Sequence, residues 1–391
     1  MKNNQLEKLS DYADYSKAKI SIAEIDTKCY FSTENMLPNK GGVTEAAGLP
    51  TQDNVTKVLP ENVLVSNIRP YFKKIYFANE LAGSSNDVLC FVAKNGCLPR
   101  YLYYLLSSDS FFDYMMAGAK GTKMPRGDKG QIMNFPVWVP AQNEQSRIVS
   151  VLSALDEKIE NISKINHNLE EQAKAIFKSW FVDFEPFQDG KFVDSELGQI
   201  PAGWQVADVY SIASVIYGAP FASKRFSAEK IGRPIVRIRD LATEAPQVYT
   251  DEIHPKGYIT KPGDIVVGMD GEFRAYLWGG EEAWLNQRVC VFQPKDNFSS
   301  AFVRLSIMPL LAAVEASEVA TTVIHLGKND IDKFKIILPD AETLRKYNAV
   351  AVPIYQQIVE NKLESRRLAQ LRDTLLPKLI SGEIDVSEVE I

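Results

Sequence analysis

Basic residues interleaved with aromatic and turn residues form the clearest chemical pattern in this sequence. The stretch FASKRFSAEKIGRPIVRIR (221–239) carries six basic residues and one acid, and KGTKMPRGDK (120–129) carries four basic residues and one acid. An Arg side chain can hold guanine O6 and N7 with two hydrogen bonds, Asn or Gln can read adenine, and Lys can neutralise phosphate. Because one such stretch occurs in each half of the chain, the pattern favours contact with nucleic acid.

The candidate DNA-contacting residues lie in these stretches and in loops that combine basic and aromatic residues. The candidates for base readout are Arg126, Arg225, Arg239, Gln287 and Arg288, and those for phosphate contact are Lys123, Lys129, Lys224 and Lys328. The other candidates are basic residues within or beside such segments, as in RPYFKK (69–74) and RAYLW (274–278): Arg69, Lys73, Lys74, Arg237 and Arg274. For each single residue, the alternative is an ordinary solvated surface charge.

The overall charge argues at first sight against nucleic acid as a partner. The net charge is −6 and the isoelectric point is about 5.4, whereas phosphate neutralisation requires Lys and Arg. The segment LISGEIDVSEVEI (379–391), however, carries four acids and no base. Part of the acidity is therefore local, and the basic stretches remain candidates for DNA contact.

No motif for catalysis occurs in the sequence. The phosphate-binding GxxxxGK[ST], the zinc-protease HExxH, the hydrolase GxSxG and the dinucleotide-binding GxGxxG are all absent. The acids of PDAETLRK (339–346) fit a helix start better than a nuclease site. The cysteines form no CxxC pair and the three histidines are far apart, so we expect no metal site. The sequence predicts a non-catalytic protein, and the alternative is an enzyme with an unrecognised site.

A long apolar seam indicates a helix over residues 143–183. Its positions step by four and three residues, a spacing of 3.5 that is typical of a coiled coil: Ile148, Leu152, Leu155, Ile159, Ile162, Asn166, Leu169, Ala173, Ile176 and Trp180. Asn166 is the one polar member, and a buried amide at such a position can select one register. The alternative is a single long core helix.

The chain contains an internal repeat. A shift of 199 residues places IMNFPVWVP (132–140) on IDKFKIILP (331–339), and the helix that follows has a second, less regular seam. Farther upstream the shift drifts to about 201, where NDVLCFVAKN matches QRVCVFQPKD. We expect the second helix within 341–391, with an acidic tail and with its first turns kinked or delayed by Pro353.

The repeat predicts an α+β fold with two similar globular domains held apart by two long antiparallel coiled-coil helices. We expect a first domain at 1–142, a helix at 143–183, a linker and second domain at 184–340, and the second helix and tail at 341–391. The residues expected to pair the helices are Leu152, Leu155, Ile159, Ile162, Asn166 and Leu169 of the first, and Ile354, Ile358, Leu368 and Leu375 of the second. No apolar run of about 18 residues and no signal-peptide core occur, so we expect a cytoplasmic protein.

Four phrases around the repeat resemble one known family: VPAQNEQSRIVSVLSALDEKIE (139–160), AIFKSWFVDFEPF (175–187), ELGQIPAGW (196–204) and LRDTLLPKLISGEID (371–385). These phrases, in this order, are similar to those of the DNA specificity subunits of type I restriction-modification systems. The resemblance implies two target-recognition domains, each reading half of a bipartite DNA sequence, and helices that set the spacing. The first half departs from the second in carrying SNDVLCF (85–91) where the second carries NQRVCVF (286–292).

The resemblance also implies partners. Two modification subunits that methylate adenine with S-adenosylmethionine would dock on the helices, and restriction subunits that use ATP and Mg²⁺ can join, whereas this chain itself would hold no cofactor. We expect Lys158, Lys174, Phe177 and Phe181 to face outward and meet these partners. The alternative is a stand-alone tandem DNA-binding regulator.

Overall fold

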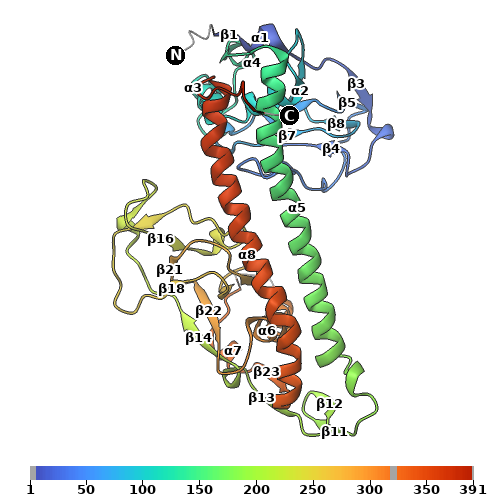
Figure 1. The fold of residues 1–391 in the computed structure, drawn as a ribbon, viewed down its shortest axis with the longest axis vertical. Coiled ribbons are helices and arrows are strands. Elements are labelled where there is room, and N and C mark those ends of the chain that lie inside the picture. Colours follow the sequence, from blue (N-terminus) through green and yellow to red (C-terminus); the bar gives the residue numbers. More distant parts are fainter. Residues whose placement is uncertain (1–5, 318–323, 390–391) are drawn as a thin grey trace. The chain divides into compact units, whose positions relative to one another are not determined.

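The computed structural model describes residues 6–317 and 324–389, and the chain forms two compact units. Unit 1 consists of residues 1–157 and 368–391, and unit 2 of residues 158–367. Two helices of 40 residues contribute to both units, namely α5 (Gln142–Phe181) and α8 (Ala341–Ile380) (Figure 1). Unit 1 is therefore assembled from two segments that lie far apart in the sequence, whereas unit 2 is one continuous segment.

Unit 1 contains two four-stranded sheets. The first is antiparallel and has the order β2 (Ala13–Tyr15), β9 (Val88–Ala93), β6 (Val63–Ser66) and β7 (Ile75–Phe77). The second has the order β3 (Lys19–Ser21), β5 (Asn54–Val58), β8 (Ala82–Ser84) and β4 (Tyr30–Phe31). Their strands are short, and the central strands β6 and β9 are largely buried, as expected for β-branched and apolar runs.

Short helices and a strand pair complete unit 1. The α-helices are α1 (Leu9–Tyr12), α2 (Pro99–Leu106), α3 (Asp109–Ala117) and α4 (Lys129–Ile132), the 3₁₀ helices are η1 (Ile22–Glu24) and η2 (Pro70–Phe72), and β1 (Glu7–Lys8) pairs with β10 (Pro136–Val137). Ser108 caps α3, and Asp128 caps α4 by accepting from two backbone amides. The Lys120 ammonium and these amides lower the pKa of Asp128 to about 2.

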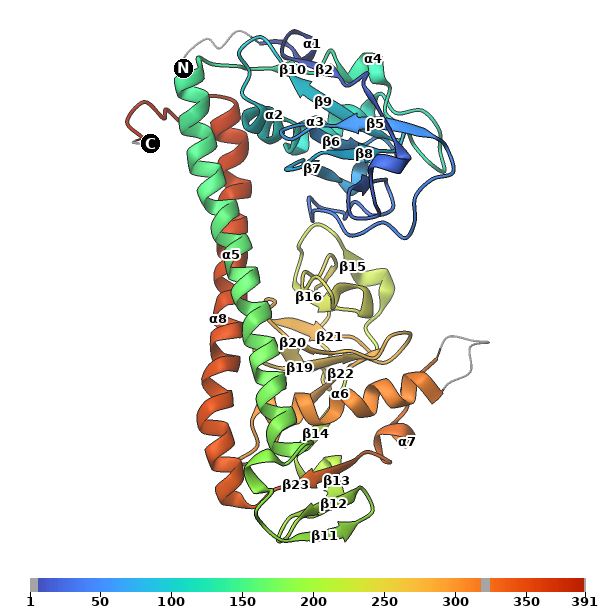
Figure 2. The same ribbon diagram turned by 90° about the vertical axis from the view of Figure 1, so that its right-hand side faces the viewer.

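Unit 2 repeats the first sheet of unit 1. Its antiparallel order is β14 (Ala213–Tyr217), β22 (Val289–Pro294), β19 (Ile265–Gly268) and β20 (Ala275–Leu277) (Figure 2). The register repeats as well, because Val63 pairs with Phe91 in unit 1 and Ile265 pairs with Phe292 in unit 2. The predicted internal repeat is thus present in the fold.

The remaining strands of unit 2 form a five-stranded sheet and two pairs. The sheet has the order β15 (Phe226–Ser227), β17 (Tyr249–Thr250), β16 (Arg233–Val236), β21 (Ala283–Leu285) and β18 (Ile259–Thr260). The pairs are β11 (Phe192–Ser195) with β12 (Gly198–Pro201), and β13 (Gln205–Asp208) with β23 (Lys335–Leu338). The 3₁₀ helices are η3 (Glu185–Phe187), η4 (Val209–Ser211), η5 (Ser223–Arg225) and η6 (Ile238–Asp240).

Two further helices complete unit 2, α6 (Ser300–Ser317) and α7 (Lys328–Ile331). Helix α6 follows β22 in the chain as α2 and α3 follow β9 in unit 1. By length and composition alone, α6 is the one helix among the described residues that could cross a membrane. A core helix meets the same criterion, and eight α6 side chains between Ala301 and Leu311 are buried in unit 2.

The long helices run antiparallel within each unit. In unit 1, Ile148 and Leu152 near the start of α5 share a core with Leu376 and Leu379 near the end of α8 (Figure 1). In unit 2, Ala173 near the end of α5 shares a core with residues from the first turns of α8. Of the predicted pairing residues, those buried are Leu152, Ile162 and Ile358, and those half-buried are Leu155, Ile159, Asn166, Leu169, Ile354, Leu368 and Leu375.

Two expectations about the helices are wrong. The delay expected from Pro353 does not occur, because α8 begins at Ala341 and includes Pro353. Asp340 caps the start of the helix by accepting from the Thr343 amide at 2.9 Å. Phe181 is 5% exposed and Phe177 is half-buried, so neither faces outward. Both rings pack against Phe302 of α6 and Tyr347 of α8, since α6 covers the face of α5 that the seam pattern leaves unpartnered.

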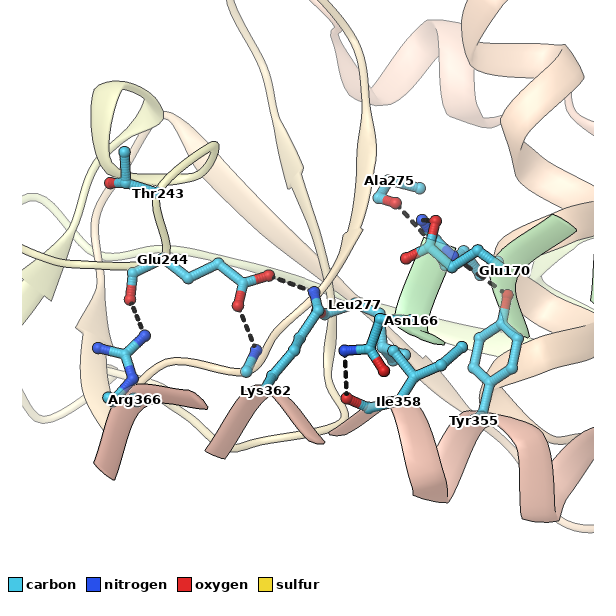
Figure 3. Close-up of polar contacts among 12 residues, drawn as sticks. Asn166, Glu170, Thr243, Glu244, Ala275, Leu277, Tyr355, Ile358, Lys362 and Arg366 are labelled. Atoms are coloured by element: carbon cyan, nitrogen blue, oxygen red, sulfur yellow. Dashed lines mark hydrogen bonds and ion pairs between the residues drawn. The ribbon is translucent and has the colours of Figure 1, made fainter. Parts of the chain in front are cut away.

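Asn166 lies in a polar contact between the helices of unit 2. Its amide nitrogen donates to the Ile358 carbonyl oxygen at 3.2 Å (Figure 3). Its Oδ1 accepts from Asn361 Nδ2 at 2.8 Å. Asn361 in turn accepts from Gln357 at 2.9 Å. The amide predicted to select a register is therefore hydrogen-bonded across the helix pair, and a shift of one helix would leave these groups unpaired.

Two further polar clusters attach the sheet of unit 2 to the helices (Figure 3). Arg304 of α6 is 8% exposed and donates to the Ala275 carbonyl of β20 at 2.7 Å, and it also contacts Tyr355 of α8 and Glu170 of α5. Lys362 of α8 lies 2.6 Å from a Glu244 carboxylate oxygen and donates to the Leu277 carbonyl at 2.7 Å. Since buried charges are stable only when paired, these contacts fix the sheet on the helices.

Unit 1 has a polar cluster in a similar place. Asp156 of α5 accepts from the Tyr104 hydroxyl of α2 at 2.8 Å and from Arg372 of α8 at 2.9 Å. In both units, a polar cluster thus joins the first helix after the sheet to both long helices.

The Asn166 contact generates a stability prediction. Asn166→Ala is expected to lower the free energy of unfolding of unit 2 by about 1–2 kcal/mol, because it leaves the Asn361 amide without its partner. Replacing both residues together, Asn166→Leu with Asn361→Leu, is expected to restore wild-type stability or exceed it, because no unpaired group remains. Urea unfolding followed by tryptophan fluorescence measures this, since four of the five tryptophans lie in unit 2.

Asn168→Ala is the matched control, because Asn168 is exposed on the same helix. It is expected to change the free energy of unfolding by less than about 0.5 kcal/mol. Equal effects of Asn166→Ala and Asn168→Ala would show that the Asn166 contact carries no stability.

Candidate nucleic-acid interface

Three chain segments meet in each unit at the end of the repeated sheet. In unit 1 they are residues 67–74 after β6, 85–87 before β9, and 120–128 before α4; we name this set loop cluster 1. In unit 2 the corresponding segments are 269–274 after β19, 286–288 before β22, and 324–327 before α7; we name this set loop cluster 2. Most of the sequence-predicted candidates lie in or beside these clusters.

The same three backbone hydrogen bonds hold both clusters together. In loop cluster 1 they run from the Asn67 amide to the Asp87 carbonyl at 2.8 Å, from Gly127 to Asn67 at 3.2 Å, and from Arg69 to Pro125 at 2.8 Å. The matching bonds in loop cluster 2 run from Met269 to Arg288 at 2.9 Å, from Leu326 to Met269 at 2.8 Å, and from Gly271 to Ile324 at 3.1 Å. The backbone of the two clusters is thus built alike, independently of the side chains.

The side chains on this shared backbone differ. In loop cluster 1, Arg126 lies 3.1 Å from the Asp87 carboxylate. In loop cluster 2, Arg288 stands where unit 1 has Asp87, and His325 stands where unit 1 has Arg126. Asp270 Oδ1 lies 2.6 Å from His325 Nδ1 and 3.6 Å from Arg288 Nη1. Arginine, aspartate and histidine therefore present different donors and acceptors at equivalent positions.

These charged groups remain accessible. The side chains of Arg126 and Arg288 are 56% and 54% exposed. Ion pairs between exposed groups contribute only about 0–1 kcal/mol to stability, so they orient the guanidinium groups without preventing new contacts. Among the described residues, each guanidinium has N–H donors without a partner, and such donors match guanine O6 and N7 or a phosphate.

Lysines flank the clusters. Lys129 and Lys328 occupy equivalent positions at the first residues of α4 and α7. Lys328 forms an ion pair with Asp332 at 2.7 Å, whereas Lys123 and Lys129 are exposed and have no ion-pair partner in the part of the chain that the structure describes. Lys123 and Lys129 can therefore reach phosphate without first breaking an ion pair.

Two candidates instead attach the loop to the next helix. Lys73 Nζ lies 2.9 Å from Asp109 of α3, and Lys40 forms a second ion pair with the same carboxylate at 3.7 Å. Arg274 lies 2.6 Å from Glu315 of α6. Burial acts to raise the pKa of Asp109, but the two lysines outweigh it and hold this pKa below its ordinary value. Arg274 likewise lowers the pKa of Glu315. Lys73 and Arg274 thus brace equivalent loops.

Lys74 and Arg69 also point partly into unit 1. Lys74 Nζ donates to the Thr33 carbonyl at 2.6 Å and lies over the Phe72 ring, and burial lowers the pKa of Lys74. Arg69 is half-buried, and its backbone is left-handed with φ of 49°. These two residues support the shape of the loop more directly than Arg126 does.

The basic stretch 221–239 lies along the five-stranded sheet of unit 2. Arg237 holds the buried Asp240 with two contacts at 3.0 and 3.3 Å, and Arg225 lies 2.9 Å from Asp251. Lys224 and Arg239 are exposed, and among the residues described they have no ion-pair partner. This stretch adjoins loop cluster 2, because the Asn286 amide donates to the Val236 carbonyl at the end of β16.

The structure therefore separates the sequence-predicted candidates into groups. Loop cluster 1 contains Arg69, Lys73, Lys74, Lys123 and Arg126, with Lys129 next to it; loop cluster 2 contains Arg274, Gln287 and Arg288, with Lys328 next to it. Lys224, Arg225, Arg237 and Arg239 belong to or flank the five-stranded sheet. Gln287 is exposed in the turn before β22.

Sequence reasoning missed three members of the clusters. Asp87, Asp270 and His325 contact the predicted arginines, yet no local pattern marks them. The signal was present in the repeat, because aligning SNDVLCF with NQRVCVF places Asp87 opposite Arg288. Within residues 6–317 and 324–389, no group of three or more His, Cys, Asp or Glu residues could hold a metal ion.

The arrangement suits recognition of a polyanion with readable edges. Each cluster offers exposed guanidinium groups, nearby lysines and an acceptor carboxylate on a rigid backbone, which together can bind phosphates and the hydrogen-bonding edges of bases.

Comparisons with known proteins agree with this arrangement. The chain is 27% identical over 345 residues to the type I restriction enzyme MjaIX specificity subunit of Methanocaldococcus jannaschii, covering 85% of this chain and 80% of that relative. It is 24% identical to the type I restriction enzyme HindI specificity subunit of Haemophilus influenzae, covering 96% of this chain and all of that relative.

A solved structure shares the fold. The crystal structure of the S subunit of a type I restriction-modification system from M. genitalium aligns over 97% of both chains with a TM-score of 0.56 and 15% identity. The family described as type I restriction modification DNA specificity domain matches residues 7–171 and 201–372, which are most of the chain and correspond to its two repeats. This protein therefore belongs to the family of type I restriction-modification DNA specificity domains.

Proposed function

We propose that this chain is the DNA-recognition subunit of a type I restriction-modification complex, and that each unit reads one half of a bipartite target. The observation that carries the proposal is the pair of loop clusters. Three equivalent backbone hydrogen bonds build the same support twice, while positions 87 and 288, and positions 126 and 325, carry different side chains. Such a pair is suited to reading two different sequences.

Within this proposal, base readout and phosphate contact fall to different residues. Arg126 and Arg288 read base edges, because they are exposed and oriented by neighbouring side chains. Lys123, Lys129, Lys224 and Lys328 contact phosphates, which fixes the position of the duplex without reading sequence. Arg225, Arg239 and Gln287 are further base-reading candidates beside loop cluster 2.

We further propose that α5 and α8 set the distance between the two half-sites and bind two modification subunits. Both helices contribute to both units, so their length is a fixed property of the chain. The modification subunits would supply S-adenosylmethionine and methylate adenine, and a restriction subunit, where present, would use ATP and Mg²⁺. This chain would recognise the DNA target and contribute no catalytic residue. We expect the complex to act in the cytoplasm.

The alternative is a stand-alone tandem DNA-binding regulator. Family membership and relatives described as specificity subunits favour the complex. Gel filtration of the chain with and without its cognate modification subunit separates these two functions. We expect a stable larger species with the modification subunit. Tight, sequence-specific DNA binding by the chain alone, without any association, would support the regulator instead.

Arg288 provides a test of half-site reading. Arg288→Ala is expected to weaken binding to the target by about 5- to 150-fold, since one well-placed base contact contributes about 1–3 kcal/mol. Discrimination should be lost in only one half-site. Binding of the assembled complex to duplexes altered in either half-site measures this.

Arg126→Ala is the matched variant in unit 1, and it is expected to relax the other half-site. If both variants weakened discrimination in the same half-site, the division of labour between the units would be wrong.

The helices provide a second test. Deleting four residues within 155–176 of α5 turns the following seam by about 40° and is expected to change or abolish the tolerated distance between half-sites. Deleting seven residues turns it by only about 20°, and should disturb helix pairing less while shortening α5 by about 10 Å. Methylation of a panel of duplexes whose half-site separation varies in single base pairs measures the preference. An unchanged preference in both variants would contradict the spacing role.

A further inference from the structure

Loop cluster 1 carries an exposed pair of aromatic side chains. Tyr71 and Phe72 are 47% and 37% exposed, and their ring centroids lie 4.6 Å apart. They belong to η2, between Arg69 and Lys73, both of which are anchored elsewhere in unit 1. Large aromatic side chains are usually buried, so two adjacent exposed rings at a basic site indicate a contact surface.

The backbone holds this pair in a defined position. Arg69 and Lys73 both adopt the left-handed conformation, with φ of 49° and 50°, which is unfavourable for residues other than glycine. The Phe72 carbonyl accepts from the Asn39 amide at 2.7 Å, and the Lys73 carbonyl accepts from the Lys40 amide at 2.9 Å. The surroundings thus enforce a strained turn, which is a feature that concentrates at binding sites.

Buried polar atoms in the same loop lack partners. Asn67 is 7% exposed, and neither its Oδ1 nor Nε of Arg69 has a hydrogen-bond partner within the described residues. Most buried polar atoms in folded proteins are paired. The loop that carries the two rings thus combines left-handed backbone at Arg69 and Lys73 with buried polar atoms that have no partner among the described residues.

Loop cluster 2 shows that the fold itself does not require the aromatic pair. At the corresponding turn, unit 2 has Gly271 and Glu272, and the Glu272 side chain is 77% exposed. The following aromatic residue, Phe273, is 2% exposed and belongs to the core. The same backbone hydrogen bonds thus support a turn with no exposed ring, so Tyr71 and Phe72 are a property of unit 1 alone.

The charges around the rings identify the ligand chemistry. Arg126 and the exposed Lys123 lie on the segment that is hydrogen-bonded to this loop, and the exposed Met124 lies between them. A polyanion whose interior is apolar matches basic groups that surround aromatic rings. Double-stranded DNA has these properties, because its bases offer ring faces and thymine methyl groups inside two rows of phosphate.

We infer that Tyr71 and Phe72 make an apolar contact with bases of the half-site that unit 1 reads. This inference rests on the proposed function and adds to it a base contact that the basic residues cannot make. At the same turn, unit 2 presents Glu272 in place of the two rings.

The test uses the chain assembled with its modification subunits. The double variant Tyr71→Ala with Phe72→Ala is expected to bind the target about 10- to 100-fold more weakly, while its affinity for DNA without the target stays within about twofold. Since no phosphate contact is lost, the slope of log affinity against log salt concentration should not change. In a scan of single base-pair changes, the variant should lose discrimination at one or two positions of one half-site only.

Two further variants serve as controls. Tyr71→Phe with Phe72→Leu keeps apolar side chains and should retain affinity within about threefold, which would attribute the loss in the double Ala variant to the missing apolar contact. Glu272→Ala, at the equivalent turn of unit 2, should leave discrimination at those same positions unchanged.

Three results would overturn the inference. The first is a base-pair scan that is identical in the wild type and the double variant. The second is an equal loss on all DNA with a smaller salt slope, which would indicate a phosphate contact. The third is a wild-type complex with no base preference, which would refute the proposed function and the inference together, whereas the first two leave the proposed function intact.

Discussion

Burial of the apolar seams of α5 and α8 is the constraint on which the rest of the structure depends. The core of each unit includes side chains from the long helices. Unit 1 needs Leu376 and Leu379 from the distant end of α8, and unit 2 needs Ala173 and Phe181 from α5. Removing a buried Leu to Ala typically costs about 2–5 kcal/mol, so the helix contacts in each unit are a substantial part of its stability. Both long helices therefore contribute to the core of each unit.

Polar contacts between the helices select one register for this apolar packing. Apolar contacts alone tolerate sliding, whereas Asn166 with Asn361, and Asp156 with Arg372, have hydrogen-bonding partners only in one register. The hydrogen bond from Lys362 to the Leu277 carbonyl of β20 does the same for the sheet of unit 2. The loop clusters lie at the ends of sheets that are attached in this way. Their positions relative to the helices are therefore fixed within each unit.

Much of this architecture could be predicted from the sequence, because the seam and the repeat are periodic signals. Both long helices and the repeat were found in this way. The packing of Phe177 and Phe181 was not, because the seam describes how two helices pair and contains no information about α6 as a third partner. The roles of Lys73 and Arg274 were also inaccessible, since their acidic partners lie 36 and 41 residues away in sequence. The number of basic residues in a loop does not reveal which charged side chains face each other.

In the two loop clusters the backbone hydrogen bonds are the same, whereas the side chains differ. Backbone hydrogen bonds carry the geometry, so side chains at positions such as 87 and 288 are free to differ without altering the fold. In unit 1 the arginine of the pair, Arg126, lies on the segment before α4, and its partner Asp87 lies on the turn before β9. In unit 2 the arginine, Arg288, lies on the turn before β22, and its partner is Asp270. The positive charge therefore comes from different segments in the two units. The donor pattern offered to a duplex changes accordingly. Because exposed ion pairs contribute little to stability, such exchanges have a small folding cost, and the same backbone can support many different recognition surfaces.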